Sequence, residues 1–138
     1  LNRIIDAGNH WSYENDDKNA VRNGYLYDWE TAKKLAPSGW HLPSKDEWES
    51  VLKNLGDNSK DIFEHLKVGG SSGFENIFSG WRLARGTFNS LGASAHYWSS
   101  TEDGDKEAWH FKVSVYSGLS EMEKIDRHSG LSVRYFRD

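Results

Sequence analysis

The sequence predicts an α+β fold in which two main helices pack on a small twisted antiparallel sheet. Apolar residues in the first half recur with the 3.6-residue period of helices, whereas those in the second half alternate with the two-residue period of strands. Helices and strands that are segregated along a chain are typical of α+β domains. The chain has 138 residues, which suits one domain. We therefore expect residues 1–138 to form a single domain.

The clearest element is a helix over residues 45–55. The Ser44 hydroxyl can accept from the first turn, and Glu47 can reach back to the Ser44 N–H, which completes a capping box. The helix has one apolar stripe, formed by Trp48, Val51, Leu52 and Leu55. We interpret Trp48, and Trp40 before the helix, as core aromatics rather than ligand-stacking side chains, because large aromatics dominate core burial.

The other helical signals are weaker. Asp28 can cap a first helix that runs from Trp29 to about Leu35. A third helix is expected over about 60–67, where the apolar spacing is less regular. Residues 1–24 are polar and rich in Asn and Asp, so we expect an ordered loop region there, followed by a short extended piece at 25–27.

The second half of the chain predicts strands. They are expected at 80–84, 96–101, 109–115, about 119–125 and 131–135. The strand at 109–115 is the clearest, because Trp109, Phe111 and Val113 alternate with polar residues as in a half-buried strand. Tyr116-Ser117-Gly118 is expected to be its hairpin turn.

Composition excludes several classes of function. The net charge is −4, which gives no basic footprint for nucleic acid, and no partner of that kind is expected. No apolar run of about 18 residues is present, so no membrane span is expected in this chain. Cys is absent, which excludes disulfides, thiol catalysis and Cys-ligated metals. With seven Trp and 14% aromatic residues, the core is expected to be rich in aromatic side chains.

Five blocks of sequence carry a family resemblance. They are Tyr25-Leu26-Tyr27-Asp28-Trp29 with Ala32, Gly39-Trp40-His41-Leu42-Pro43-Ser44 with Glu47-Trp48, Ser79-Gly80-Trp81-Arg82, Tyr97-Trp98-Ser99-Ser100-Thr101-Glu102, and Gly130-Leu131-Ser132-Val133-Arg134. In this order and over nearly the whole chain, they resemble the Fibrobacter succinogenes major paralogous domain family.

The resemblance implies a fold, a location and a kind of role. The implied fold is C-type lectin-like, with two helices, a small twisted sheet and long irregular loops. Members are mostly secreted or attached to the cell surface, often as lipoproteins, and their biochemical role is uncertain. The start at Leu1 resembles a point just past the family's opening strand, so the N-terminal strand is expected to be truncated here.

Four positions depart from the family pattern. Family members typically carry Cys where this chain has Ser12, Ala20, Ala36 and Tyr135. The resemblance implies that 12 with 20, and 36 with 135, are spatial pairs whose disulfides were lost together. A disulfide that closes a long loop contributes about 4 kcal/mol, so packing has to compensate. Tyr135 is accordingly expected to fill space near Ala36.

Calcium is considered because C-type lectins often bind sugar through it. Two loops offer clustered oxygen ligands, one with Asp103, Asp105 and Glu107 and one at 15–19. Neither fits the EF-hand register, and the sugar-binding triplets of C-type lectins are absent. The alternative is that both are solvated turns. We expect no cofactor and keep calcium as the minor alternative.

No enzyme is expected. Formylglycine-generating enzymes share a related fold but use active-site Cys, which is absent here. The six His show no metal-ligand spacing and no nucleophile elbow accompanies them. We expect an extracytoplasmic recognition or surface-protein module whose partner is a glycan or a surface protein. A purely structural module is the alternative, and an enzyme related to formylglycine-generating folds is the less favoured one. The candidate ligand-binding residues, chosen from the loops and strands between about 75 and 125, are Arg82, Arg85, Asn89, Glu102, Asp103, Asp105 and Tyr116.

Overall fold

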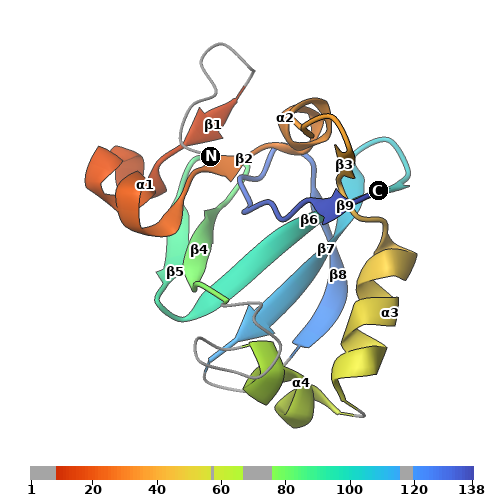
Figure 1. Cartoon of the computed structure of the whole chain (residues 1–138). Helices are drawn as coiled ribbons and strands as arrows, with labels where there is room; N and C mark the ends of the chain where they lie inside the picture. Colours follow the sequence, from red (N-terminus) through yellow and green to blue (C-terminus); the bar gives the residue numbers. More distant parts are fainter. Residues whose placement is uncertain (1–8, 57, 67–75, 116–119) are drawn as a thin grey trace.

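The computed structural model describes residues 9–56, 58–66, 76–115 and 120–138, and a curled five-stranded sheet dominates it (Figure 1). The strands are β1 (His10–Trp11), β2 (Leu26–Tyr27), β3 (Trp40–His41), β4 (Ser79–Arg82), β5 (Phe88–Leu91), β6 (Ser94–Asp103), β7 (Glu107–Ser114), β8 (Ser120–Asp126) and β9 (Phe136–Arg137). The helices are the 3-10 helix η1 (Tyr13–Asn15), α1 (Asp17–Asn23), α2 (Trp29–Lys34), α3 (Lys45–Leu55) and α4 (Ser59–Leu66).

The main sheet has the strand order β5-β4-β6-β7-β8. β6, β7 and β8 form an antiparallel meander, while β4 pairs antiparallel with β5 and parallel with β6. Two short ladders lie beside the sheet, one between β1 and β2 and one between β3 and β9. The β3–β9 ladder brings the C-terminal end of the chain next to the loop that precedes α3 (Figure 1).

Helices α3 and α4 pack on one face of the sheet. α3 contacts β6 and β7, and α4 contacts β8. Trp48 is fully buried and stacks on Phe111, with ring centroids 5.1 Å apart. Phe111 is the register partner of Tyr97 on β6, and their rings lie 6.2 Å apart at 14°. The core on this face is therefore a stack of aromatic rings.

A second apolar cluster lies on the other face. Side chains alternate along a strand, so Trp98 points away from the α3 side to which Tyr97 belongs. It packs with residues of α2, the Leu42 loop and the segment before β9, and the buried members are Tyr27, Trp29, Ala32, Leu42, Trp98, Ala108 and Leu131. The sheet is thus the central layer between two clusters.

The predicted balance of helix and sheet was wrong. Of the described residues, 39% lie in strands and 29% in helices, so the architecture is a curled half-barrel with a few short helices rather than two main helices on a small C-type lectin-like sheet. The strands β6 and β7 extend beyond their predicted limits, and β5 was not predicted. The residues that extend β6 beyond the prediction include Ser94, Glu102 and Asp103, and these polar ends hid its length from an apolar pattern.

Several local predictions are confirmed. The helix over 45–55 is present, with both hydrogen bonds of the Ser44–Glu47 capping box. Asp28 caps α2 by accepting from the Thr31 N–H.

The loop region that was expected at 1–24 instead contains α1, capped by Asp16. Residues 1–8 of that region lie outside the described residues. Among the described residues, no helix has the length and apolar character needed to cross a bilayer.

The aromatic stack predicts which substitution destabilises the fold. Trp48→Ala should lower the free energy of unfolding by about 3–5 kcal/mol, because it removes a fully buried indole and leaves a cavity. Val21→Ala is the matched control: Val21 is 82% exposed, and its loss should change stability by no more than about 0.5 kcal/mol. Urea denaturation measures both. Equal stabilities for the two variants would contradict this account of the core.

Candidate functional site

A cleft of about 590 Å³, called here the aromatic cleft, lies in the described part of the chain. Its walls come from the α1–β2 turn, the α2–β3 loop, the start of β4, the middle of β6 and the segment before β9. The lining residues are Asn23, Gly24, Tyr25, Tyr27, Leu35, Pro37, Trp40, Ile77, Ser79, Tyr97, Ser132, Val133, Arg134 and Tyr135. Four tyrosines and one tryptophan therefore meet in one space.

Backbone geometry brings these segments together. Gly24 ends α1 at φ 79°, which L side chains rarely adopt, and turns the chain into β2. The main chain of Tyr27 then exchanges hydrogen bonds of 2.8 and 2.9 Å with Leu131, which draws the segment before β9 against β2. The Trp40 N–H donates to the Pro37 carbonyl at 3.0 Å, in a turn that carries Trp40 to the cleft rim.

The polar groups of the cleft are mostly hydroxyls. The Tyr135 hydroxyl donates to the Ala32 carbonyl at 2.7 Å, and the Tyr97 hydroxyl donates to Asn76 Oδ1 at 2.7 Å. Burial raises the pKa values of Tyr27, Tyr97 and Tyr135, that of Tyr135 to about 12. These phenols therefore stay protonated and neutral at every physiological pH.

Ser132 adds a hydroxyl of a different kind. Ser132 is 7% exposed, and its Oγ is buried without a hydrogen-bond partner among the described residues. Among the described residues that line the cleft, Arg134 is the only charged one, and none is Asp, Glu, His or Lys. The lining can stack on and hydrogen-bond to a ligand, but it supplies no pair of groups for acid–base catalysis.

The exposure of Trp40 differs from the sequence interpretation. Trp48 is a core aromatic as predicted, but Trp40 is 43% exposed and was wrongly interpreted as core. On β3, His41 faces Phe136 and α3, so its neighbour Trp40 faces the other way. This alternation beside the Gly39 turn is the signal that could have identified it.

Three predicted ligand-binding residues lie outside the aromatic cleft, on β4, on β5 and in the turn between them. The guanidinium of Arg82 lies 4.1 Å from the Trp11 ring centroid, and Arg82 pairs with Gly130 through its main chain. Arg85 is exposed in the turn between β4 and β5. Asn89, on β5, lines a separate cavity described below.

The predicted acidic residues lie at the β6–β7 hairpin. Glu102 Oε2 accepts from Arg127 at 3.2 Å, and the Asp103 carboxylate lies 3.3 Å from the Lys124 ammonium. Asp105 is exposed at the tip of the hairpin. Tyr116 lies outside the described residues. The structure does not gather these residues into one concavity, and their role stays a prediction.

The two calcium candidates also stay predictions. Asp103 is engaged by Lys124, while Asp105 and Glu107 are exposed. In the other cluster, Asp16 caps α1 and the Asn19 amide donates to the Tyr13 carbonyl at 2.9 Å. Within the ranges that the structure describes, no group of three or more His, Cys, Asp or Glu is placed to hold a metal ion.

The positions of the missing cysteines are packed. Ser12 and Ala20 are 7% and 4% exposed. Tyr135 is half-buried, packs on the Trp98 cluster together with Leu35, and bonds to the carbonyl of Ala32 on the helix that precedes Ala36. Tyr135 thus fills space beside α2 and forms one wall of the aromatic cleft.

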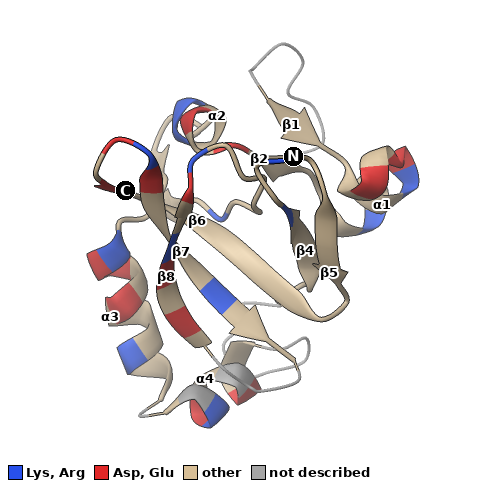
Figure 2. Ribbon diagram, turned by 180° about the vertical axis from the view of Figure 1, so that it is seen from behind, with Lys and Arg blue, Asp and Glu red and all other residues tan. Residues whose placement is uncertain are grey.

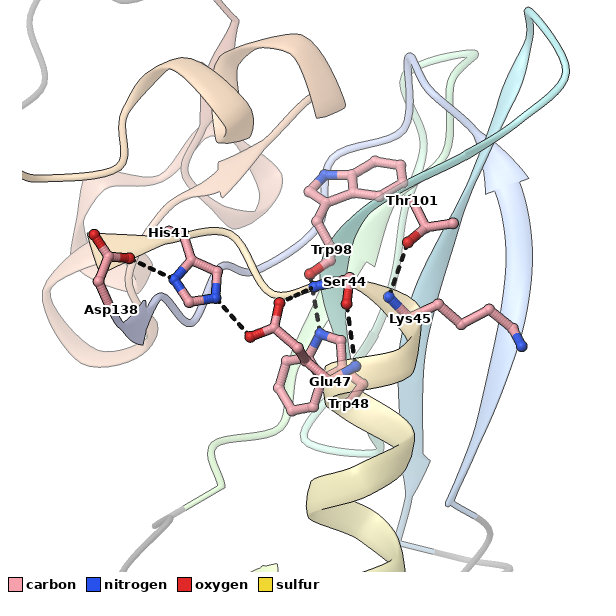
Figure 3. A network of polar contacts seen from close by, with 8 residues as sticks. All are labelled: His41, Ser44, Lys45, Glu47, Trp48, Trp98, Thr101 and Asp138. Carbon is pink, nitrogen blue, oxygen red and sulfur yellow. Dashed lines mark hydrogen bonds and ion pairs between the residues drawn. The ribbon is translucent and has the colours of Figure 1, made fainter. Parts of the chain in front are cut away.

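Apart from the aromatic cleft, a polar network lies at the start of α3, where His41 bridges two carboxylates (Figure 3). Its Nε2 lies 2.6 Å from Glu47 Oε2, and its Nδ1 lies 2.7 Å from Asp138 Oδ1. The other Glu47 oxygen accepts from the Ser44 N–H at 3.0 Å as part of the capping box. This carboxylate–imidazole–carboxylate clasp connects the last residue of the chain to the first turn of α3.

The clasp shifts the titration of its members. Hydrogen bonds to Glu47 and Asp138 raise the pKa of His41, because both ring nitrogens donate only in the protonated form. The hydrogen bond from the Ser44 N–H is the largest cause that lowers the pKa of Glu47, and the hydrogen bond with His41 lowers it further. Both shifts favour the charged pair, an imidazolium held between carboxylates.

Comparison with known protein families matches residues 3–137 to the Fibrobacter succinogenes major domain. The chain belongs to this family. Comparisons with curated proteins and with solved structures gave no match. In this Fibrobacter succinogenes major domain, the blocks that carried the resemblance supply the clasp (His41, Glu47), much of the aromatic cleft (Tyr25, Tyr27, Trp40) and the central strand β6 (Tyr97, Trp98).

The clasp predicts a pH dependence of stability. The raised pKa of His41 means that its contribution is complete below the ordinary value of 6.5 and is lost as pH rises through the raised value. The lowered pKa of Glu47 means that its contribution is present above 4.5 and is lost as pH falls through the lowered value. His41→Gln should therefore lower the melting temperature more at pH 6 than at pH 9.

Thermal melts of the wild type and the variant at both pH values check this prediction. Asp138→Asn, which removes one of the two carboxylates, should reproduce part of the pH 6 effect. A His41→Gln difference of the same size at pH 6 and pH 9 would show that the imidazolium does not stabilise the fold.

Removal of the Tyr97 hydroxyl and removal of the Ser132 hydroxyl should have different effects on stability. Tyr97→Phe should cost about 1–3 kcal/mol, because it leaves the buried Asn76 Oδ1 without its donor. Ser132→Ala should be neutral or stabilising, because the Ser132 hydroxyl has no partner to lose among the described residues. Chemical denaturation of both variants is the measurement. A large loss of stability in Ser132→Ala would reveal a bond that this account lacks.

Proposed function

We propose that this domain is an extracytoplasmic recognition module that binds carbohydrate in the aromatic cleft. The observation that carries the proposal is the exposed Trp40 ring at the rim of a cleft whose walls hold Tyr25, Tyr27 and Tyr135. The extracytoplasmic location rests on the family resemblance alone. Binding at this cleft is recognition without bond-making, since its described lining offers no acid–base pair.

Carbohydrate suits this lining for two physical reasons. The apolar face of a sugar ring packs on an aromatic ring, and concave sites of a few hundred Å³ with a few polar groups are the usual form of small-ligand sites. The tyrosine hydroxyls are neutral, and Ser79, Ser132 and Asn23 add hydroxyl and amide groups at the walls. Such groups match sugar hydroxyls better than they match a charged peptide.

Two of the exposed large apolar side chains support the choice of this cleft. Trp40 is 43% and Ile77 is 39% exposed, and both line it. Leu91 is 40% and Val115 is 39% exposed, but neither lines a described cavity. These four apolar side chains are therefore similarly exposed, and two of them line the cleft while two do not.

The test is a glycan array followed by calorimetry on the best-bound glycan. Trp40→Ala and Ile77→Ala should each weaken binding, Trp40→Ala by about tenfold or more, because the loss of a stacking ring removes at least about 1.4 kcal/mol. Leu91→Ala and Val115→Ala should bind as the wild type does.

The same experiment with and without a metal chelator separates binding in the aromatic cleft from calcium-dependent binding at the acidic loop. Binding that survives the chelator assigns recognition to the cleft without calcium, whereas binding that needs added calcium supports the acidic loop at Asp103 and Asp105. A flat array, or equal losses in all four variants, would overturn the proposal. A purely structural module would then be the better account of the chain.

A further inference from the structure

A second cavity, called here the polar cavity, lies on the face of β6 and β7 opposite to α3. It has a volume of about 530 Å³ and shares no lining residue with the aromatic cleft. Its lining residues are Trp81, Asn89, Ser90, Ala93, Ser94, His96, His110, Lys112, Ser114, Glu123, Lys124 and Ile125. Figure 2 shows that β7 and β8 carry charged residues of both signs along this part of the sheet.

Three buried side chains in the polar cavity form a hydrogen-bonded relay. Ser94 Oγ lies 2.9 Å from His96 Nε2, and His96 Nδ1 lies 3.1 Å from His110 Nε2. The residues are 6%, 4% and 1% exposed. A hydroxyl on Nε2 of a histidine, whose Nδ1 is held by a third group, is the arrangement that activates a serine nucleophile.

The direction of this relay depends on which ring nitrogens carry protons, and one arrangement suits catalysis. With a proton on Nδ1 of each imidazole, His96 Nδ1 donates to His110 Nε2, and His96 Nε2 accepts the Ser94 proton. His110 Nδ1 has no hydrogen-bond partner among the described residues.

Both imidazoles are neutral. Burial lowers the pKa of His96 well below 6.5, and Lys112 and His110 act in the same direction. Burial also lowers the pKa of His110, to about 4, with Glu123 opposing it. The Trp81 and His96 rings pack against each other with centroids 5.3 Å apart. A bare, neutral Nε2 facing a serine hydroxyl is able to act as a general base.

We propose that Ser94 is a nucleophile, activated by His96 and positioned through His110, that accepts acyl groups from small esters in the polar cavity. This activity is independent of carbohydrate binding in the aromatic cleft. It departs from the sequence-based expectation of a non-enzymatic chain, which weighed sequence spacing and could not include strand pairing. Lys112, the register partner of His96, lines the same cavity with its ammonium 3.7 Å from the Glu123 carboxylate, and we expect it to offset the negative charge of the oxyanion.

The reaction balances without a cofactor. The Ser94 oxygen forms a bond to the ester carbonyl carbon, the carbonyl electron pair moves to its oxygen, and the Ser94 proton moves to His96 Nε2. Collapse restores the carbonyl and breaks the bond to the alcohol, which leaves with the proton from His96. Water then attacks the acyl carbon and gives a proton to His96. Collapse breaks the bond between the acyl carbon and the Ser94 oxygen and releases the acid, and the Ser94 oxygen takes the proton back from His96.

The test uses a fluorophosphonate probe, with the labelled residue mapped by mass spectrometry, together with hydrolysis of p-nitrophenyl acetate. We expect labelling at Ser94 of the folded wild type and none after heat denaturation. Ser94→Ala should abolish labelling, and His96→Gln should lower the rate of ester hydrolysis by about 100-fold or more. Ser50→Ala is the matched control, since Ser50 is exposed on α3 and lines neither of the two cavities, and it should react like the wild type.

Mapping on the wild type decides the question even if a variant fails to fold. No labelling above the denatured control, or labelling elsewhere than Ser94, would overturn the proposal. Carbohydrate binding is measured separately, so failure of one site does not imply failure of the other.

The positioning role of His110 has its own readout. His110 lowers the pKa of His96, so in His110→Gln the acid limb of the pH–rate profile should move to higher pH. In the wild type the rate should stay constant through about pH 6.5, where an exposed histidine titrates. If His110→Gln hydrolyses the ester more slowly but the acid limb of its pH–rate profile does not move, His110 has a structural role only.

Discussion

Three buried indole N–H groups join distant segments of this chain to one another through main-chain carbonyls. Trp29 donates to Ser99 at 2.8 Å, Trp48 to Trp98 at 3.3 Å, and Trp98 to Tyr27 at 2.7 Å. The first two acceptors lie at the register shift of β6, between Trp98 and Glu102, where carbonyls are released from the ladder. A buried indole without its acceptor costs about 1–3 kcal/mol, so each bond fixes the position of a helix or strand. A chain without Cys is held across its layers in this way.

Strand β6 is also the common wall of both candidate sites. Tyr97 lines the aromatic cleft, while its neighbour His96 lines the polar cavity. Because side chains alternate along a strand, one strand places a phenol and an imidazole on opposite faces of the sheet. The tryptophan bonds that fix β6 therefore fix both sites at once. This explains how so short a chain builds two separate concavities around one rigid element.

The parts of the fold that depend on local sequence could be predicted. The α3 capping box involves residues three positions apart, and the alternation of β7 lies within eight residues, so both are visible in the sequence. The aromatic cleft was not predicted, because its walls come from five segments joined by pairings such as Tyr27 with Leu131. The family resemblance suggested a small sheet, and the extent of the real one emerged only from strand pairing along β6.

The buried histidines show where alternation alone misleads. The alternation of β7 predicts polar side chains on the face opposite to Phe111, yet His110 on that face is only 1% exposed. Two neutral imidazoles are tolerated there because they bond to each other and to Ser94. Such a network seldom adds stability over well-packed apolar side chains of the same volume. Its presence in a cavity is therefore explained better by the chemistry that a bare imidazole nitrogen allows than by the stability of the sheet.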